Sequence, residues 1–302
     1  MTQSEAGAAG REALKSRVLP QMAFNKPKGT PKPTQRISNS QSGDMAKARF
    51  QVEGNAIVTG GAGTLGLAAA RALLEHGLAG LMIFDRTLDQ AEAEIERLRV
   101  EYPCASILSK QVDITDEIAV SEAVVHTAEL LGSVDILLCF AGVVGCVHAV
   151  EMTATEWRRT LDINTTGSFL CAQAVAKQII LQGTGGSIVF IASISGHRVN
   201  FPQPQVAYNT SKAAVLAMTN SLAAEWARYG IRVNSISPGY MDTILNEGDG
   251  IADARAIWAD RNPMGRMGEP NELTGLVVLL ASNAGSYMTG TDIICDGGQV
   301  LL

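Results

Sequence analysis

The chain has few cysteines and histidines, and those it has are scattered. Its five cysteines form no Cys-x-x-Cys pair and do not cluster with the four histidines, so the sequence offers neither a metal site nor a disulfide framework. No apolar run approaches the roughly 20 residues that a membrane-spanning helix needs. We therefore expect no metal and no membrane span, with the cysteines as buried thiols of a reducing, cytoplasmic compartment.

Charge is unevenly distributed along the 302 residues. Residues 1–43 carry seven basic and two acidic side chains, whereas the remainder carries 17 basic and 28 acidic side chains, a net charge of −11. Such an acidic body does not favour nucleic acid. Residues 1–44 are rich in Pro, Gly, Ser, Lys and Gln, so we expect a disordered tail. Its basic composition leaves a mitochondrial transit peptide open, against which Glu5 and Glu12 argue.

From Phe50 onward, short β-branched runs alternate with helical stretches. This alternation predicts a parallel sheet with helices on both faces, and the length suits one large core. We therefore expect residues 45–302 to form a single doubly wound α/β domain with a Rossmann-type sheet of about seven strands. The expected strands are 56–59, 81–84, 106–112, 136–140, 187–192, 232–237 and 292–295, and the expected helices include 65–76, 88–100, 118–131, 208–229 and 272–281.

A glycine-rich turn follows the first expected strand. The sequence from Ala56 reads Ala-Ile-Val-Thr-Gly-Gly-Ala-Gly-Thr-Leu-Gly. A strand that runs into such a turn and then into a helix holds a dinucleotide pyrophosphate at the helix N-terminus. The expected cofactor-binding residues of this turn are Gly60, Gly63, Thr64, Leu65 and Gly66.

Asp85 stands at the end of the second expected strand, 19 residues after Gly66. A carboxylate at this position accepts hydrogen bonds from the adenosine ribose and repels a 2′-phosphate, which favours NAD over NADP. Two features weigh against a firm assignment. Asp85 could instead cap the helix expected at 88–100, and the neighbouring Arg86 would soften the preference for NAD.

Tyr208 and Lys212 begin an apolar run that continues to Tyr229. Residues four apart share a helix face, so the Lys212 ammonium is expected one turn from the Tyr208 phenol, where it would lower the phenol pKa. A phenol with a lowered pKa exchanges protons with an alcohol or ketone. Ser195, thirteen residues upstream, follows an apolar segment and could supply a hydroxyl to the same oxygen. The pair alone fits an ordinary amphipathic helix equally well, and the glycine-rich turn favours the catalytic interpretation.

Together these features resemble the short-chain dehydrogenase/reductase family from about Phe50 to Leu302. The resemblance implies hydride transfer between a nicotinamide cofactor and a secondary alcohol or ketone. It also implies a homotetramer that pairs its long helices. The implied catalytic residues are Asn164, Ser195, Tyr208 and Lys212. Asn164 is implied at a helix kink, where its main chain would hold a water that links the lysine to solvent.

The resemblance implies further cofactor contacts at the ends of later strands. Asp113 and Ile114 would border the adenine, and Pro238, Gly239 and Thr243 would face the nicotinamide. Ala141 and Gly142 keep the small pair that lets the backbone approach the cofactor. The two asparagines that usually precede this pair in the family are Cys139 and Phe140 in this chain.

Residues 240–267 contain a predicted substrate lid with a helical patch at 253–260, in which Trp258 would either face the substrate or pack the lid. The segments 193–197, 238–243 and 262–266 are similar to the branch of polyol enzymes that includes D-arabinitol 2-dehydrogenases and L-sorbose reductases. That similarity implies a polyol and its ketose as the small-molecule substrates. Two alternatives stay open: a 3-oxoacyl or other ketone reductase of the same family, and a non-catalytic scaffold that senses the cofactor.

Overall fold

The computed structural model describes residues 22, 42–243, 246 and 248–301. The predicted tail, residues 1–44, lies outside the described residues except for Met22 and the start of helix α2 (Ser42–Phe50). Helix α2 begins three residues before the expected domain boundary. The disorder predicted for the rest of the tail stays a prediction.

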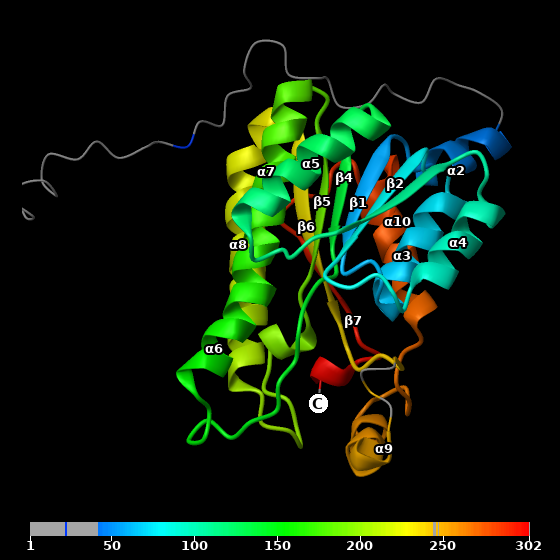
Figure 1. The fold of residues 1–302 in the computed structure, drawn as a ribbon. Helices are drawn as coiled ribbons and strands as arrows, with labels where there is room; N and C mark the ends of the chain where they lie inside the picture. Colours follow the sequence, from blue (N-terminus) through cyan, green and yellow to red (C-terminus); the bar gives the residue numbers. More distant parts are fainter. Residues whose placement is uncertain (1–21, 23–41, 244–245, 247, 302) are drawn as a thin grey trace, which may run out of the picture.

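A seven-stranded parallel sheet forms the centre of the molecule (Figure 1), in the order β3-β2-β1-β4-β5-β6-β7. The strands are β1 (Asn55–Thr59), β2 (Gly80–Asp85), β3 (Ser106–Gln111), β4 (Ile136–Cys139), β5 (Gly186–Ile191), β6 (Ile231–Pro238) and β7 (Asp292–Cys295). Strands β1 and β4 are buried along their whole length, as strands covered on both faces must be. The predicted doubly wound α/β fold is confirmed.

The direction of strand addition reverses between β1 and β4. Val58 lies opposite Ile83 of β2 and Leu138 of β4, so one neighbour of β1 follows it directly in the chain and the other comes only after β3. In open α/β sheets, ligands bind outside the carboxyl ends of the strands at such a reversal. The glycine-rich turn after β1 and the small residues after β4 therefore lie where a dinucleotide is expected.

Helices cover the two faces of the sheet in two groups (Figure 1). On one face lie α3 (Thr64–Glu75), α4 (Glu92–Glu101) and α10 (Thr274–Ala281), and on the other lie α5 (Glu117–Leu131), α7 (Ser168–Gln182) and α8 (Val206–Trp226). Successive strand residues supply the two cores alternately: Val58 packs with the first group, and Ile57 packs with the second. Among the described residues, the helices are all too short or too polar to cross a membrane.

A helical irregularity separates α6 (Ala154–Leu161) from α7. A capping box formed by Thr153 and Glu156 starts α6. Residues Asp162–Gly167 then form a π-helical turn, which is a conformation found mostly as a short bulge at functional sites. A Cβ on Gly167 would lie 2.7 Å from the Ile114 side chain, so the bulge packs directly against the segment after β3. This turn carries Asn164.

The predicted lid contains helix α9 (Ala252–Asp260), as expected from residues 253–260. Helix α9 projects beyond the sheet at the end where α6 also lies (Figure 1). Trp258 is 6% exposed and stacks on Tyr240, with ring centroids 4.2 Å apart. Arg255 Nη2 also donates to Asp242 Oδ1 over 2.9 Å. The tryptophan therefore packs the lid against the segment that follows β6.

Three helices differ most from the sequence prediction. Helix α4 begins four residues late, because a turn in which the Ala91 N–H donates to the Leu88 carbonyl precedes it. Helix α8 ends at Trp226 and is followed by a 3-10 turn, Ala227–Tyr229. The last expected helix is divided into a 3-10 turn, Pro270–Leu273, and α10. Such shifts are common where helix ends tighten into 3-10 turns.

Candidate active site

Helix α8 brings the predicted tyrosine and lysine together. The Lys212 Nζ lies 5.6 Å from the centroid of the Tyr208 ring and donates a 2.7 Å hydrogen bond to the carbonyl oxygen of Ile191. Lys212 is 6% exposed. Burial disfavours the charged amine and lowers its pKa from 10.5 to about 8. The lysine is therefore anchored at the end of β5 and titrates close to neutral pH.

Tyr208 behaves differently from the sequence expectation. Burial raises the pKa of its phenol above 10, while a hydrogen bond with Ser193 acts in the opposite direction. The nearby phenol of Tyr240 raises the pKa further. The Lys212 Nζ lies 5.6 Å from the centroid of the Tyr208 ring, yet the net shift of the phenol pKa is upward. The lowered Tyr208 pKa expected from helical spacing is thus not found in this structure.

The serine that contacts Tyr208 is Ser193. Its side chain hydrogen-bonds the phenol, and it is the second residue after β5. The predicted Ser195 lies in the 3-10 turn Ile194–Gly196, where its Oγ accepts a 3.0 Å hydrogen bond from Ser193 Oγ. The structure therefore places Ser195 next to Ser193, and it places Ser193 next to the tyrosine.

A signal for Ser193 was present in the sequence. Ser193 is the first hydroxyl residue after the apolar run of β5, and groups just beyond the carboxyl ends of parallel strands project into ligand sites. The choice of Ser195 depended on a spacing of thirteen residues from Tyr208, whereas Ser193 stands fifteen residues upstream. A fixed spacing from Tyr208 takes no account of the length of the loop between β5 and α8.

Asn164 connects three segments of the site. Its Oδ1 accepts a hydrogen bond from the Val143 N–H over 2.8 Å, and its Nδ2 donates to the Val143 carbonyl and to Ser211 Oγ over 2.9 and 3.0 Å. A Cβ on Gly142 would lie 3.3 Å from Asn164 Oδ1 and 3.8 Å from Lys212 Nζ. The π-helical turn, the segment after β4 and helix α8 thus meet at Gly142.

The glycine-rich turn forms a tight cradle at the start of α3. Gly60 has φ +64, and a Cβ there would lie 2.4 Å from the backbone nitrogen of Ala141. A Cβ on Gly66 would lie 2.4 Å from the Gly60 carbonyl oxygen. Gly63 is the N-cap of α3, Thr64 and Leu65 begin its first turn, and no side chain of the described residues caps it. The N–H groups of this first turn fit a pyrophosphate, because they point at an anion and need a partner.

The predicted adenosine-side residues lie at the ends of β2 and β3. Asp85 accepts hydrogen bonds from the Ala62 N–H at 3.1 Å and the Thr87 N–H at 3.3 Å. It does not cap α4, whose N-cap is Ala91, so the alternative role weighed for Asp85 is not found. Asp113 accepts hydrogen bonds from Thr115, which lower the pKa of its carboxyl, and the next residue, Ile114, is buried.

The residues predicted near the nicotinamide lie beyond β6. Pro238 is the last residue of β6, opposite Cys295 of β7, and the Gly239 N–H donates to the Cys295 carbonyl over 3.0 Å. A Cβ on Gly239 would lie 2.8 Å from Asp296, so the two segments pack closely. Thr243 is 7% exposed, at the start of the lid. The structure thus brings the predicted cofactor residues to the carboxyl ends of β1 to β4 and β6.

Comparisons with known proteins agree with this geometry. A family model described as enoyl-(acyl carrier protein) reductase matches residues 60–299. The chain is 37% identical over 264 residues to a ribulose-forming D-arabinitol 2-dehydrogenase of Scheffersomyces stipitis, covering 82% of this chain and 95% of the relative. It is 37% identical over 254 residues to an NADP-dependent mannitol dehydrogenase of Hypocrea jecorina, covering 82% and 93%.

Among solved structures, a short-chain type dehydrogenase/reductase from Mycobacterium marinum is 38% identical, with a TM-score of 0.77, and the match covers 83% of this chain and 97% of that one. The fold and the site define a nicotinamide-dependent oxidoreductase that acts on CH–OH groups. Within that class, the chain belongs to the short-chain dehydrogenase/reductase family.

We expect replacement of the two serines by alanine to lower kcat to different extents. Ser193→Ala removes the hydroxyl that contacts Tyr208, so we expect kcat to fall roughly 10²–10³-fold, the cost of removing one donor to a reacting oxygen. Ser195→Ala, the matched control, is expected to lower kcat less than about tenfold, because Ser195 acts through Ser193. Steady-state reduction of a ketone substrate measures both. A larger loss in Ser195→Ala than in Ser193→Ala would restore Ser195 as the substrate-binding serine.

Proposed function

We propose that this protein transfers a hydride between a nicotinamide cofactor and a secondary hydroxyl of a polyol, with the ketose as the product. The observation that carries the proposal is the meeting of Ser193, Tyr208 and Lys212 at the carboxyl end of β5, on the side of the sheet where the glycine cradle lies. The arabinitol and mannitol dehydrogenase names of its relatives support a polyol as the substrate class.

In this reaction, the side chains of the protein bind the substrate oxygen and transfer its proton. The bound nicotinamide supplies the hydride acceptor or donor. Ser193 orients the substrate oxygen, and Tyr208 gives a proton to it during reduction or, as the phenolate, takes one from it during oxidation. Because burial raises its pKa, Tyr208 stays a neutral phenol near pH 7, the form that protonates a ketone. Lys212, with a pKa of about 8, exchanges protons in the same pH range beside Asn164.

The reaction and its substrate class are tested together by following reduced-cofactor oxidation with sorbose, fructose and ribulose, and with an acyl thioester as contrast. We expect turnover of at least one ketose and none of the thioester. Tyr208→Phe should keep NADH binding and lose roughly 10²–10⁴-fold in kcat, because it lacks the acid–base group. Turnover of the thioester alone would favour the acyl reductase alternative. Cofactor binding without turnover of any ketone would favour the non-catalytic scaffold.

We propose that NAD is the preferred cofactor. Asp85 holds a carboxylate at the end of β2, where it would repel the 2′-phosphate of NADP. We expect Asp85→Ser to raise the ratio of kcat/KM for NADPH to that for NADH by at least about tenfold, since the like-charge repulsion is lost. Asp89→Ser, four residues further along in an exposed position, is the matched control and should leave the ratio unchanged. A wild-type preference for NADPH would overturn this assignment.

We propose a homotetramer as the assembly. Helices α5 and α7 expose apolar side chains, with Ile118 70%, Val125 49% and Leu181 81% accessible in the single chain. These side chains would leave water if the two helices pair with their copies in a neighbouring subunit. Light scattering should give four times the chain mass, and Val125→Glu should shift it toward smaller species. A monomeric wild-type mass would refute the proposal.

A further inference from the structure

A second tyrosine, Tyr240, lies close to the catalytic one. It stands two residues beyond the end of β6, at the start of the lid. Its ring stacks on that of Trp258 in α9, with centroids 4.2 Å apart and planes inclined by 6°. Its phenol is near enough to that of Tyr208 to raise the pKa of the catalytic group. The stacking therefore holds a second phenol beside the first in a fixed orientation.

The side-chain amide of Gln203 determines how the Tyr240 hydroxyl can be used. The Gln203 Oε1 accepts a hydrogen bond from Trp258 Nε1 over 3.1 Å. Its Nε2 donates to the Tyr240 hydroxyl over 3.0 Å and to Gln205 Oε1 over 3.3 Å. An indole N–H can only donate, so the amide oxygen must face Trp258 and the amide nitrogen must face Tyr240. The Tyr240 hydroxyl therefore accepts from Gln203 and cannot donate to it.

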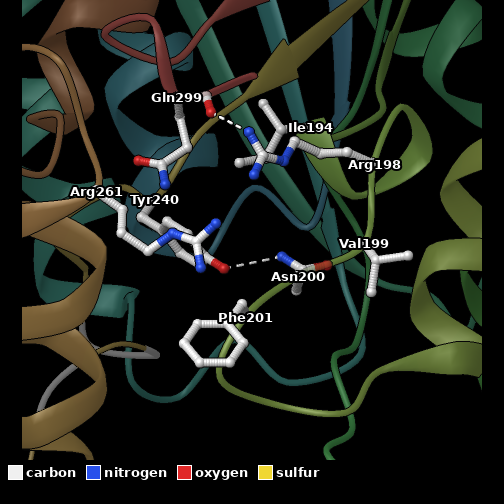
Figure 2. Close-up of a pocket in the computed structure, with 8 residues that line it drawn as sticks. All are labelled: Ile194, Arg198, Val199, Asn200, Phe201, Tyr240, Arg261 and Gln299. Carbon is white, nitrogen blue, oxygen red and sulfur yellow. Dashed lines mark hydrogen bonds between the residues drawn. The ribbon is translucent and has the colours of Figure 1, made fainter. Parts of the chain in front are cut away.

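A second amide also donates to the Tyr240 hydroxyl. Asn200 Nδ2 lies 3.0 Å from the phenol oxygen, along the dashed line in Figure 2. A phenol accepts through its oxygen and donates through its single O–H. With both amides directed at the oxygen, the O–H of Tyr240 has no acceptor among the residues that the structure describes. A donor in such a half-buried position needs a partner.

A small hollow lies beside Tyr240 (Figure 2). It is bounded by the loop after Ser195, by Tyr240, by Arg261 at the end of the lid helix and by Gln299. Its free interior is about 10 Å³, which has room for one water and for no part of a substrate chain. A water in the hollow is therefore one possible acceptor for the Tyr240 O–H, and a substrate hydroxyl would have to approach from the side of Tyr208.

The amide contacts connect Tyr240 to the start of α8. Gln205, whose Oε1 accepts from Gln203, is the N-cap of α8 and is 7% exposed. Tyr208 is the third residue of that helix. Two hydroxyls on adjacent carbons of a polyol are held close together, so two neighbouring phenols match them. One phenol would serve the reacting oxygen, and the other would bind the oxygen next to it.

We propose that Tyr240 donates a hydrogen bond to a substrate hydroxyl on a carbon next to the reacting one. Gln203 is then a positioning residue, because its amide nitrogen leaves the Tyr240 O–H free for the substrate. This assignment rests on the proposed function, since it names the part of a polyol or ketose that the same site recognises. It requires the site to favour ketones with that neighbouring hydroxyl, because a donor left unpaired in the complex costs binding.

Erythrulose and its two deoxy analogues test this contact, because this open-chain ketose carries a hydroxyl on each carbon next to its carbonyl. The 1-deoxy analogue lacks the hydroxyl on one side, and the 3-deoxy analogue lacks it on the other. With the preferred reduced cofactor, Tyr240→Phe should lower kcat/KM for erythrulose about tenfold, the effect of one lost hydrogen bond. With at least one analogue, the wild type and the variant should agree within about twofold, because the bonded hydroxyl is already absent.

A second variant keeps the phenol and changes only its partner. Gln203→Glu places a carboxylate oxygen where the amide nitrogen lies, so the Tyr240 O–H should donate to it and be lost to the substrate. We expect a similar loss of about tenfold on erythrulose, and little loss on the same analogue. Tyr287→Phe, at a fully exposed tyrosine, is the matched control and should leave all three ketones unchanged. Cofactor binding by each variant verifies the fold.

Several outcomes would contradict this assignment while leaving the proposed function intact. Equal losses on all three ketones in Tyr240→Phe would show that the phenol acts only through packing. No loss on any of them would show that Asn200 or a water already accepts its O–H. Full activity of Gln203→Glu on erythrulose would remove the positioning role of Gln203.

The wild-type enzyme gives the remaining answers. Reduction of L-sorbose without any reduction of erythrulose would also overturn the contact, since erythrulose carries both of the hydroxyls that it needs. Reduction of no ketose at all would remove the proposed function itself, and the contact with it.

Discussion

Lys212 places an amine in the interior of the protein, where its Nζ donates a hydrogen bond to the carbonyl oxygen of Ile191 at the end of β5. Ser193 follows Ile191 by two residues, and Tyr208 lies one helical turn before Lys212. This one contact therefore fixes how helix α8 and strand β5 present the serine and the tyrosine to each other. A buried amine that lost this partner would be strongly unfavourable, so α8 cannot slide along the sheet without a loss of stability.

Burial acts on the two titratable groups of this helix in opposite directions. It lowers the pKa of the Lys212 amine to about 8 and raises that of the Tyr208 phenol above its usual value. The tyrosine thus keeps its proton near neutral pH, while the lysine is close to its own titration. A protonated tyrosine suits the reduction of a ketone, and a lysine that exchanges protons readily suits the recharging of that tyrosine after each turnover.

The sequence predicts the strands, the helices and their order well, because local patterns along the chain determine them. The apolar run of β7, the capping box at Thr153 and Glu156, and the acidic residue that ends β2 all depend on neighbours along the chain. What local patterns do not determine is the packing. Helical spacing shows that Tyr208 and Lys212 meet, but the direction of the phenol pKa depends on how deeply the fold buries it. The choice between Ser193 and Ser195 depends on the path of the loop between β5 and α8, which no local pattern records.

The residues around the small hollow beside Tyr240 come from segments remote in sequence. The stacking of Trp258 on Tyr240 and the ion pair of Arg255 with Asp242 hold the lid against the segment after β6, which brings Arg261 toward Asn200 and Gln299. All of the residues around the hollow lie outside the strands. The strand ends position the glycine cradle and the serine, so the packing of these loops and the position of the cradle depend on different contacts. The strand ends and the loops that pack over them can therefore change independently of each other in this fold.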